Sequence, residues 1–115
     1  MTRSTEFQRV RRYGKSYAHP LMVLVALPAE NPAPQPHCGV TAGRSVGSAV
    51  QRNRAKRLLR AAVQPHLPAI LPGWDLVLIA REPLLRAGFV QIQAALSGLL
   101  RRARLLREAH DLREH

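Results

Sequence analysis

The sequence predicts a single α+β domain over residues 1–115, in which helices pack on a small β-sheet. Three observations support this fold class. The chain has 115 residues, and chains usually divide into domains only beyond roughly 250 residues. Its hydrophobic content of 46% is enough for one core. Short apolar runs alternate with segments of helical spacing, in the order helix, two or three strands, helix, strand, helix.

The N-terminal stretch predicts a short helix over Ser4–Tyr13. Hydroxyl residues at its start can cap it, and Glu6 lies near the positive end of the helix dipole. Phe7 and Val10 are spaced to share one face, and Gly14 ends the helix. We therefore expect a helix with one small apolar face.

Three short segments that follow predict strands. Leu21–Leu27 is apolar and too short for a stable helix, and Tyr17–Ala18 predicts a shorter strand before it. Pro28–Pro36 holds four of the nine prolines, so it sustains neither a helix nor a ladder and is an exposed connection. His37–Ala42 resumes as a strand. We expect Leu21–Leu27 and His37–Ala42 to form an antiparallel pair.

The second half of the chain predicts two helices and one strand. Gly43–Gly47 is a turn into a helix over about Gly47–Gln64, which the following prolines stop. The apolar run Leu76–Ala80 predicts a central strand. Helical spacing over Gly88–Arg107 predicts a long amphipathic helix with arginines beside its apolar stripe. We expect the acidic tail after about residue 107 to be disordered.

The charge balance indicates a polyanionic partner. Lys and Arg number 18 against 7 Asp and Glu, which gives a net charge of +11 at pH 7. No segment approaches the roughly 18 apolar residues of a membrane span, and the N-terminus lacks the apolar region of a signal peptide. Cys38 is the single cysteine, which suits a reducing compartment. We expect a cytoplasmic protein with no membrane partner.

The predicted main helix has two opposed faces. Five of the nine residues from Arg52 to Arg60 are basic and none is acidic. On a helical wheel, one arc of this helix is apolar and comprises Ala55, Leu58, Leu59 and Ala62. The opposite arc comprises Asn53, Lys56, Arg57 and Arg60, with Arg52 and Arg54 on its flanks. We expect the apolar arc to dock and the polar arc to bind phosphate, while the Asn53 amide can both donate and accept at a base edge or a 2′-hydroxyl.

The residue chemistry does not predict a catalytic or metal site. The seven carboxylates are scattered, Cys38 has no cysteine partner, and the five histidines lack metal-ligand spacing. His37 and Cys38 adjoin, but neighbouring side chains on a strand point to opposite faces. We expect Trp74 to pack in the core or against a loop rather than to stack on a base.

The stretch from Val40 to Arg60 closely resembles the signature of the bacterial ribonuclease P protein component, which is Gly-x-Ala-Val-x-Arg-Asn-Arg-x-Lys-Arg-x-x-Arg. Every fixed position of this pattern is met from Gly47 onward. Glu6–Val10 with Gly14 also looks like the family's first helix, and Asp75–Arg81 looks like its last strand. The resemblance therefore covers essentially the whole chain.

The resemblance implies three helices around a four-stranded sheet, in the order α-β-β-β-α-β-α, with a left-handed β-α-β crossover. It further implies a protein subunit that binds the catalytic ribonuclease P RNA and the single-stranded 5′ leader of precursor tRNA. Removal of the leader would be performed by the RNA with Mg²⁺, which the RNA and substrate hold. We expect no obligate protein partner.

The resemblance also assigns candidate binding residues. The leader would lie in a cleft between the first helix and the sheet. Arg52, Asn53 and Arg54 would belong to the surface that faces the RNA subunit, and Arg44 would also bind RNA. Lys56, Arg57 and Arg60 would lie near that surface or at the margin of the cleft. The residues of the leader cleft would be Phe7, Arg11 and Lys15. The family often has a second aromatic at the position of Arg11, another aromatic at Val25, and a Lys-Lys pair at Arg44-Ser45. At Arg11 a guanidinium contact would then replace stacking on the leader.

Other function classes fit the same composition less well. A structural RNA-binding protein of ribosomal type would share the charge and layout but leave tRNA cleavage unchanged. A protein-only nuclease would need a cluster of carboxylates to hold its metal ions, and this sequence has none. A helix-turn-helix DNA-binding protein would need a short helix and turn before the arginine-rich helix. RNA-recognition modules stack bases on strand aromatics, and neither Leu21–Leu27 nor Leu76–Ala80 contains one.

Overall fold

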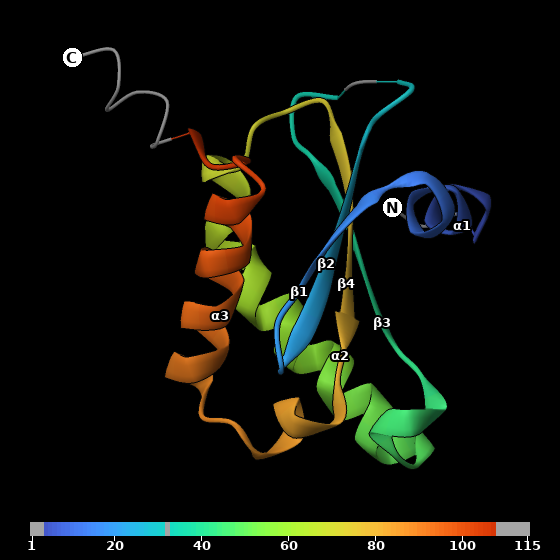
Figure 1. Cartoon of the computed structure of the whole chain (residues 1–115), viewed down its shortest axis with the longest axis vertical. Coiled ribbons are helices and arrows are strands. Elements are labelled where there is room, and N and C mark those ends of the chain that lie inside the picture. Colours follow the sequence, from blue (N-terminus) through green and yellow to red (C-terminus); the bar gives the residue numbers. More distant parts are fainter. Residues whose placement is uncertain (1–3, 32, 108–115) are drawn as a thin grey trace.

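Three α-helices surround a four-stranded sheet in the computed structural model, which describes residues 4–31 and 33–107 (Figure 1). The expected disordered tail lies outside these residues. The α-helices and strands are α1 (Ser4–Tyr13), β1 (Lys15–Ala18), β2 (Met22–Pro28), β3 (His37–Ala42), α2 (Ala49–Val63), β4 (Trp74–Ala80) and α3 (Phe89–Arg102). Short 3-10 helices are η1 (Arg44–Val46), η2 (Gln64–Ala69) and η3 (Glu82–Arg86). The predicted fold class and order of elements are confirmed.

The sheet order is β1-β2-β4-β3. β2 pairs antiparallel with both β1 and β4, and β3 pairs parallel with β4, so α2 is the crossover between two parallel strands. The predicted antiparallel pairing of Leu21–Leu27 with His37–Ala42 is wrong, because β4 lies between them. Leu76, Val77 and Leu78 are all buried, and a strand that is apolar on both faces takes a central place.

The two faces of the sheet are covered unequally. α2 and α3 lie on one face and α1 on the other (Figure 1). The main core on the α2 and α3 face includes Leu24, Leu59, Leu78, Leu96 and Leu100. On the α1 face, a small cluster joins Val10, Val25 and Val77, with Phe7, Val23, Leu27 and Ile79 half-buried around it. One short helix therefore leaves much of that face uncovered.

Gly14 allows α1 to end close to the sheet. A Cβ at this position would lie 2.5 Å from the Val10 carbonyl oxygen and 2.6 Å from Cγ1 of Val25. The Gly14 amide instead donates to that carbonyl at 2.8 Å. The bounds predicted for the first helix are confirmed, and its close approach explains why a glycine ends it.

α3 ends earlier than predicted. Its last residue is Arg102 rather than Arg107. Arg104 has a φ of +57°, which lies outside the helical region and turns the chain. Leu105 is then buried, and its carbonyl accepts a hydrogen bond from Leu71 at 2.8 Å. The periodic apolar pattern continued past the helix because this extended segment also needs an apolar residue in the core.

Candidate functional site

The cationic face of α2, which we define as Arg52, Asn53, Arg54, Lys56, Arg57 and Arg60, lies opposite the buried face of the helix. Asn53, Arg54, Arg57 and Arg60 are exposed, and Arg52 and Lys56 are half-buried. Ala55, Leu59 and Ala62 have no exposed surface. The predicted division of this helix into a docking arc and a polar arc is confirmed, although Leu58 is only half-buried.

This face carries uncompensated charge. Among the described residues, Arg9 and Arg86 pair with carboxylates and the His37 ring contacts Asp75, and none of these contacts involves a residue of the cationic face. Arg44 in η1 is also exposed and precedes α2 by a few residues. Clustered arginines without acidic partners repel one another unless an anion binds, and the planar guanidinium pairs well with phosphate.

The residues that precede the face shape the start of α2. Gly47 has a φ of +141°, and a Cβ there would lie 2.0 Å from Oε1 of Gln51. That Gln51 oxygen accepts a hydrogen bond from the Ser48 amide at 2.8 Å, and the Ser48 hydroxyl accepts one from the Gln51 amide at 3.3 Å. This capping box satisfies two amides that would otherwise lack partners. The small residues of the motif therefore set where the helix begins.

Two of the three residues assigned to leader binding lie together on α1. Phe7 and Arg11 are one helical turn apart, with Phe7 half-buried against the small cluster on the sheet and Arg11 exposed. Beside them, Val23 and Ile79 are partners in register and are only partly covered. A half-covered apolar surface next to a ring and a guanidinium can hold an unpaired nucleotide.

The structure separates Lys15 from this group. Lys15 pairs in register with Ala26, a residue of the main core, so its side chain lies on the sheet face opposite α1. Its ammonium is 5.6 Å from the centre of the Tyr17 ring, and Arg102 of α3 is 6.0 Å from the same ring. The assignment of Lys15 to leader binding stays a prediction, but the residue does not lie beside Phe7.

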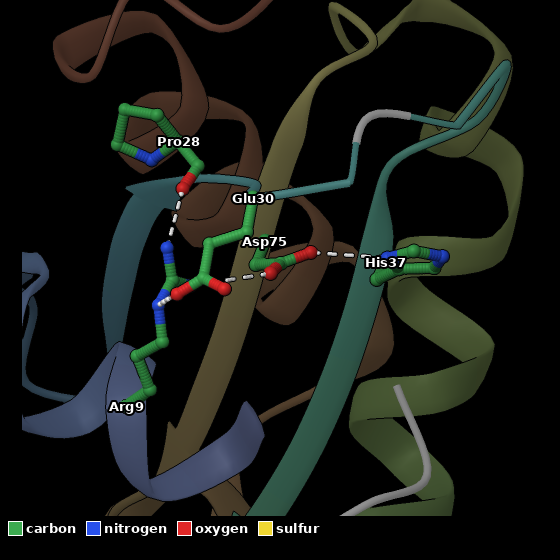
Figure 2. Close-up of polar contacts among 5 residues, drawn as sticks. All are labelled: Arg9, Pro28, Glu30, His37 and Asp75. Carbon is green, nitrogen blue, oxygen red and sulfur yellow. Dashed lines mark hydrogen bonds and ion pairs between the residues drawn. The ribbon is translucent and has the colours of Figure 1, made fainter. Parts of the chain in front are cut away.

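A charged cluster that the sequence analysis missed fastens α1 to the sheet (Figure 2). Arg9 is 3.6 Å from Oδ2 of Asp75 and 2.7 Å from Oε1 of Glu30, and it donates to the Pro28 carbonyl at 3.1 Å. Asp75, only 5% exposed, also lies 3.0 Å from Nδ1 of His37. The cluster therefore joins α1, β3, β4 and the connection after β2. A lone acid at the start of an apolar strand was the available signal.

The cysteine and the tryptophan lie where the sequence predicted. His37 faces Asp75 on the α1 side of the sheet, whereas Cys38 packs against the main core on the other side. Burial raises the pKa of the half-buried Cys38 to about 12. Trp74 packs half-buried against the main core. Within the described residues, no group of three His, Cys, Asp or Glu side chains is placed to hold a metal ion.

None of the helices in the described part of the chain combines the length and the apolarity needed to span a bilayer.

Comparisons with known proteins agree on one family. The sequence model described as Ribonuclease P matches residues 1–113. The ribonuclease P protein component of Herpetosiphon aurantiacus is 43% identical over 100 residues, which cover 87% of this chain and 80% of that protein. The component from Chloroflexus aurantiacus is 40% identical over 107 residues, covering 92% of this chain and 78% of that protein.

Solved structures show the same arrangement. The ribonuclease P protein of Staphylococcus aureus superposes with a TM-score of 0.77 at 27% identity, covering 92% of this chain and 95% of that one. The Thermotoga maritima protein superposes with a TM-score of 0.72 at 27% identity, covering 84% of this chain and 89% of that one.

Proposed function

The chain belongs to the ribonuclease P protein family, and on that premise we propose that its cationic face on α2 binds the RNA subunit of the enzyme. It is the protein component of an endoribonuclease holoenzyme that processes the 5′ end of tRNA. The observation that supports the proposal is the unpaired charge on α2: six neighbouring polar side chains, five of them basic, without a described acid beside them.

The chemistry of this face suits an RNA backbone. Each guanidinium can pair with a phosphate. Binding then releases the counterions that had been condensed on the RNA backbone. Asn53 supplies an acceptor as well as donors, so it can contact a 2′-hydroxyl or a base edge. In the proposed complex the RNA and substrate hold Mg²⁺ and perform the hydrolysis. The protein lowers the Mg²⁺ that the RNA needs by neutralising phosphates near the site.

The α1 face of the sheet is the proposed binding surface for the leader. Phe7 offers a ring on which a leader base can stack. Arg11 offers a cation for the phosphates of the leader beyond that base. Mature tRNA has no leader, so these contacts favour the precursor. In this proposal the protein works in the cytoplasm, with ribonuclease P RNA and precursor tRNA as its partners and without an obligate protein partner.

Cleavage of a precursor tRNA at low Mg²⁺ tests the proposal. Three reactions are compared: a bacterial ribonuclease P RNA alone, the same RNA with this protein, and the protein alone. The proposal predicts stimulation in the combined reaction and no cleavage by the protein alone. Tight RNA binding without stimulation would favour a structural protein of ribosomal type, and cleavage by the protein alone would overturn the assignment of hydrolysis to the RNA.

A further inference from the structure

A second cationic surface lies at the β1 edge of the sheet. We define this edge surface as Lys15, Tyr17, Arg101, Arg102 and Arg104. The Tyr17 ring lies close to both Lys15 and Arg102. Arg102 also donates to the carbonyl of Ala18, the last residue of β1, at 2.9 Å. These contacts hold the end of α3 against the edge strand and place Lys15 and Arg102 beside the same ring. Arg101 and Arg104 adjoin Arg102 in the chain.

The charge of the edge surface is also unpaired within the described residues. Lys15 and the three arginines are exposed. Glu6, Glu30, Asp75 and Glu82 are the acids that the structure describes, and the salt bridges they form go to Arg9, His37 and Arg86. A basic residue in the last turn of a helix is favourable for the helix dipole. That effect fades beyond the last turn and does not account for Arg104, which follows the helix, or for Lys15 on β1.

The edge surface and the cationic face of α2 lie at opposite edges of the sheet. β1 and β3 are the two edge strands. α3 packs on β1 and β2, whereas α2 packs on β3 and β4 (Figure 1). Three strand spacings of about 4.8 Å separate the edges, before the helices are counted. The edge surface and the cationic face of α2 are therefore separate groups of cations, although α2 and α3 also contact each other.

A hollow of about 570 Å³ adjoins these cations. Its lining includes His19, Gln91, Gly98 and Arg102. Its volume is in the range of small-ligand pockets, which run from about 300 to 1,000 Å³. Gly98 has no atom within 4 Å of the place where a Cβ would stand, so the floor of the hollow is open on the α3 side. A nucleotide can bind there while its phosphate contacts Arg102, the arginine in this lining.

We propose that the edge surface binds the phosphodiester backbone of a second RNA segment, with one nucleotide in the hollow beside Arg102. This inference builds on the proposed function of α2. RNA suits the surface better than an anionic membrane does. The large hydrophobic side chains exposed in the described chain are Tyr13, Val50, Phe89 and Val90, and none belongs to the edge surface. A membrane-binding surface usually inserts such side chains.

The test measures affinity as a function of KCl concentration for two arms: the protein with ribonuclease P RNA, and the assembled holoenzyme with precursor tRNA. The edge variant is Arg101→Gln with Arg104→Gln, and its matched control is Arg101→Lys with Arg104→Lys, which keeps the charge. Loss of two phosphate contacts lowers the slope of log Kd against log salt by about 1.4 to 1.8. The arm in which the slope falls identifies the RNA that supplies the segment.

Gly98→Leu is a second variant that leaves the charge unchanged. Its side chain occupies part of the hollow, where a Cβ meets no other atom within 4 Å. Leucine favours a helix more than glycine does, so we expect the fold to be retained. We expect weaker binding in the same arm as the edge variant, with the salt slope preserved.

A double variant on α2, Arg57→Gln with Arg60→Gln, separates the two proposals. One outcome is that the α2 variant lowers the slope while the edge variant and Gly98→Leu both match wild type in both arms. That result would overturn the edge proposal and leave the α2 proposal standing. If the edge variants lower binding and the α2 variant does not, the α2 proposal is overturned instead. Loss of binding to phosphatidylglycerol vesicles in the edge variant, with both RNA slopes unchanged, would assign the surface to a membrane and also overturn the edge proposal.

Discussion

Arg9 in α1 and Asp75 in β4 form an ion pair, with Nη1 and Oδ2 3.6 Å apart, that fastens the N-terminal helix to the centre of the sheet. The carboxylate is almost fully buried and also contacts His37 of the edge strand β3 (Figure 2). α1 has only a small apolar cluster beneath it. The position of Phe7 over the sheet therefore depends on a polar contact as well as on packing.

Asp75→Asn tests this contact. The variant keeps the shape of the side chain but removes the charge that faces Arg9 and His37. We expect the free energy of unfolding to fall by about 1–3 kcal/mol, because the side chain loses its negative charge and an NH₂ donor replaces one of its two acceptor oxygens. Urea denaturation measures this change in the free energy of unfolding. The control is Glu82→Gln, which removes an exposed pair with Arg86 and should leave stability near wild type. Equal stability of the two variants would contradict the role given to Asp75.

Phe7→Leu tests the leader-binding surface. Leucine preserves apolar packing on the cluster but removes the ring. Base stacking on an aromatic side chain contributes about 1–3 kcal/mol, so we expect precursor tRNA to bind the holoenzyme roughly 5-fold more weakly or worse. Mature tRNA should bind as before.

Phe89→Leu is the matched control for Phe7, because Phe89 is an exposed phenylalanine of α3, on the opposite side of the sheet. Binding experiments with precursor and mature tRNA compare the two variants. A similar loss in both, or an equal loss for precursor and mature tRNA, would argue against a stacking role for Phe7.

The half-buried Cys38 should react slowly with thiol reagents. Burial raises its pKa to about 12, so the reactive thiolate is scarce at neutral pH. We expect labelling by a disulfide reagent at pH 8 to be slow in the folded protein and fast in guanidinium chloride. A Cys38→Ala protein with Ser45→Cys, an exposed position, provides the control for an accessible thiol. Equal labelling rates at the two positions would show that Cys38 is not protected.

The same shift predicts a pH dependence of stability. The folded-state pKa of Cys38 is raised from an ordinary value of 9.0 to about 12, so the folded protein holds this proton more tightly than the unfolded chain does. The resulting stability is fully present below about pH 9 and is lost as the pH rises towards 12. The difference in unfolding free energy between wild type and Cys38→Ala should therefore shrink over this range. A constant difference would contradict the shift.

Leu59→Ala tests the docking face of α2. Leu59 has no exposed surface, so its truncation should cost about 2–5 kcal/mol of unfolding free energy. Leu58→Ala, at the half-buried neighbouring position, should cost clearly less. Thermal and urea unfolding measure both. Equal costs would contradict the difference in burial between these two positions of the apolar arc.

Local features of the fold were predictable from the sequence. The bounds of α1 and the buried arc of α2 depend on residues close together in the chain, and the structure confirms them. The pairing of β2 with β3 was wrong because strand order is decided by which strand can be buried on both faces. β4 is apolar on both faces, and this decides its inner position only when all four strands are considered together.

The site was predictable in part for the same reason. The cationic face of α2 follows from helical spacing within one segment. The cluster around Asp75 joins Arg9, Glu30 and His37 from three other segments, and no spacing rule links them. The separation of Lys15 from Phe7 likewise follows from the register of β1 on β2, which the sequence alone does not set.

The salt dependence of binding to ribonuclease P RNA tests directly whether the cationic face of α2 binds RNA. The variant is Arg57→Glu, at an exposed position of that face. Arg57→Lys keeps the charge and serves as the control. We expect Arg57→Glu to fold normally, to bind more weakly and to lower the slope of log Kd against log salt by about 0.9 or more, since it loses a phosphate contact. A folded Arg57→Glu protein with wild-type affinity and slope would contradict RNA binding by this face.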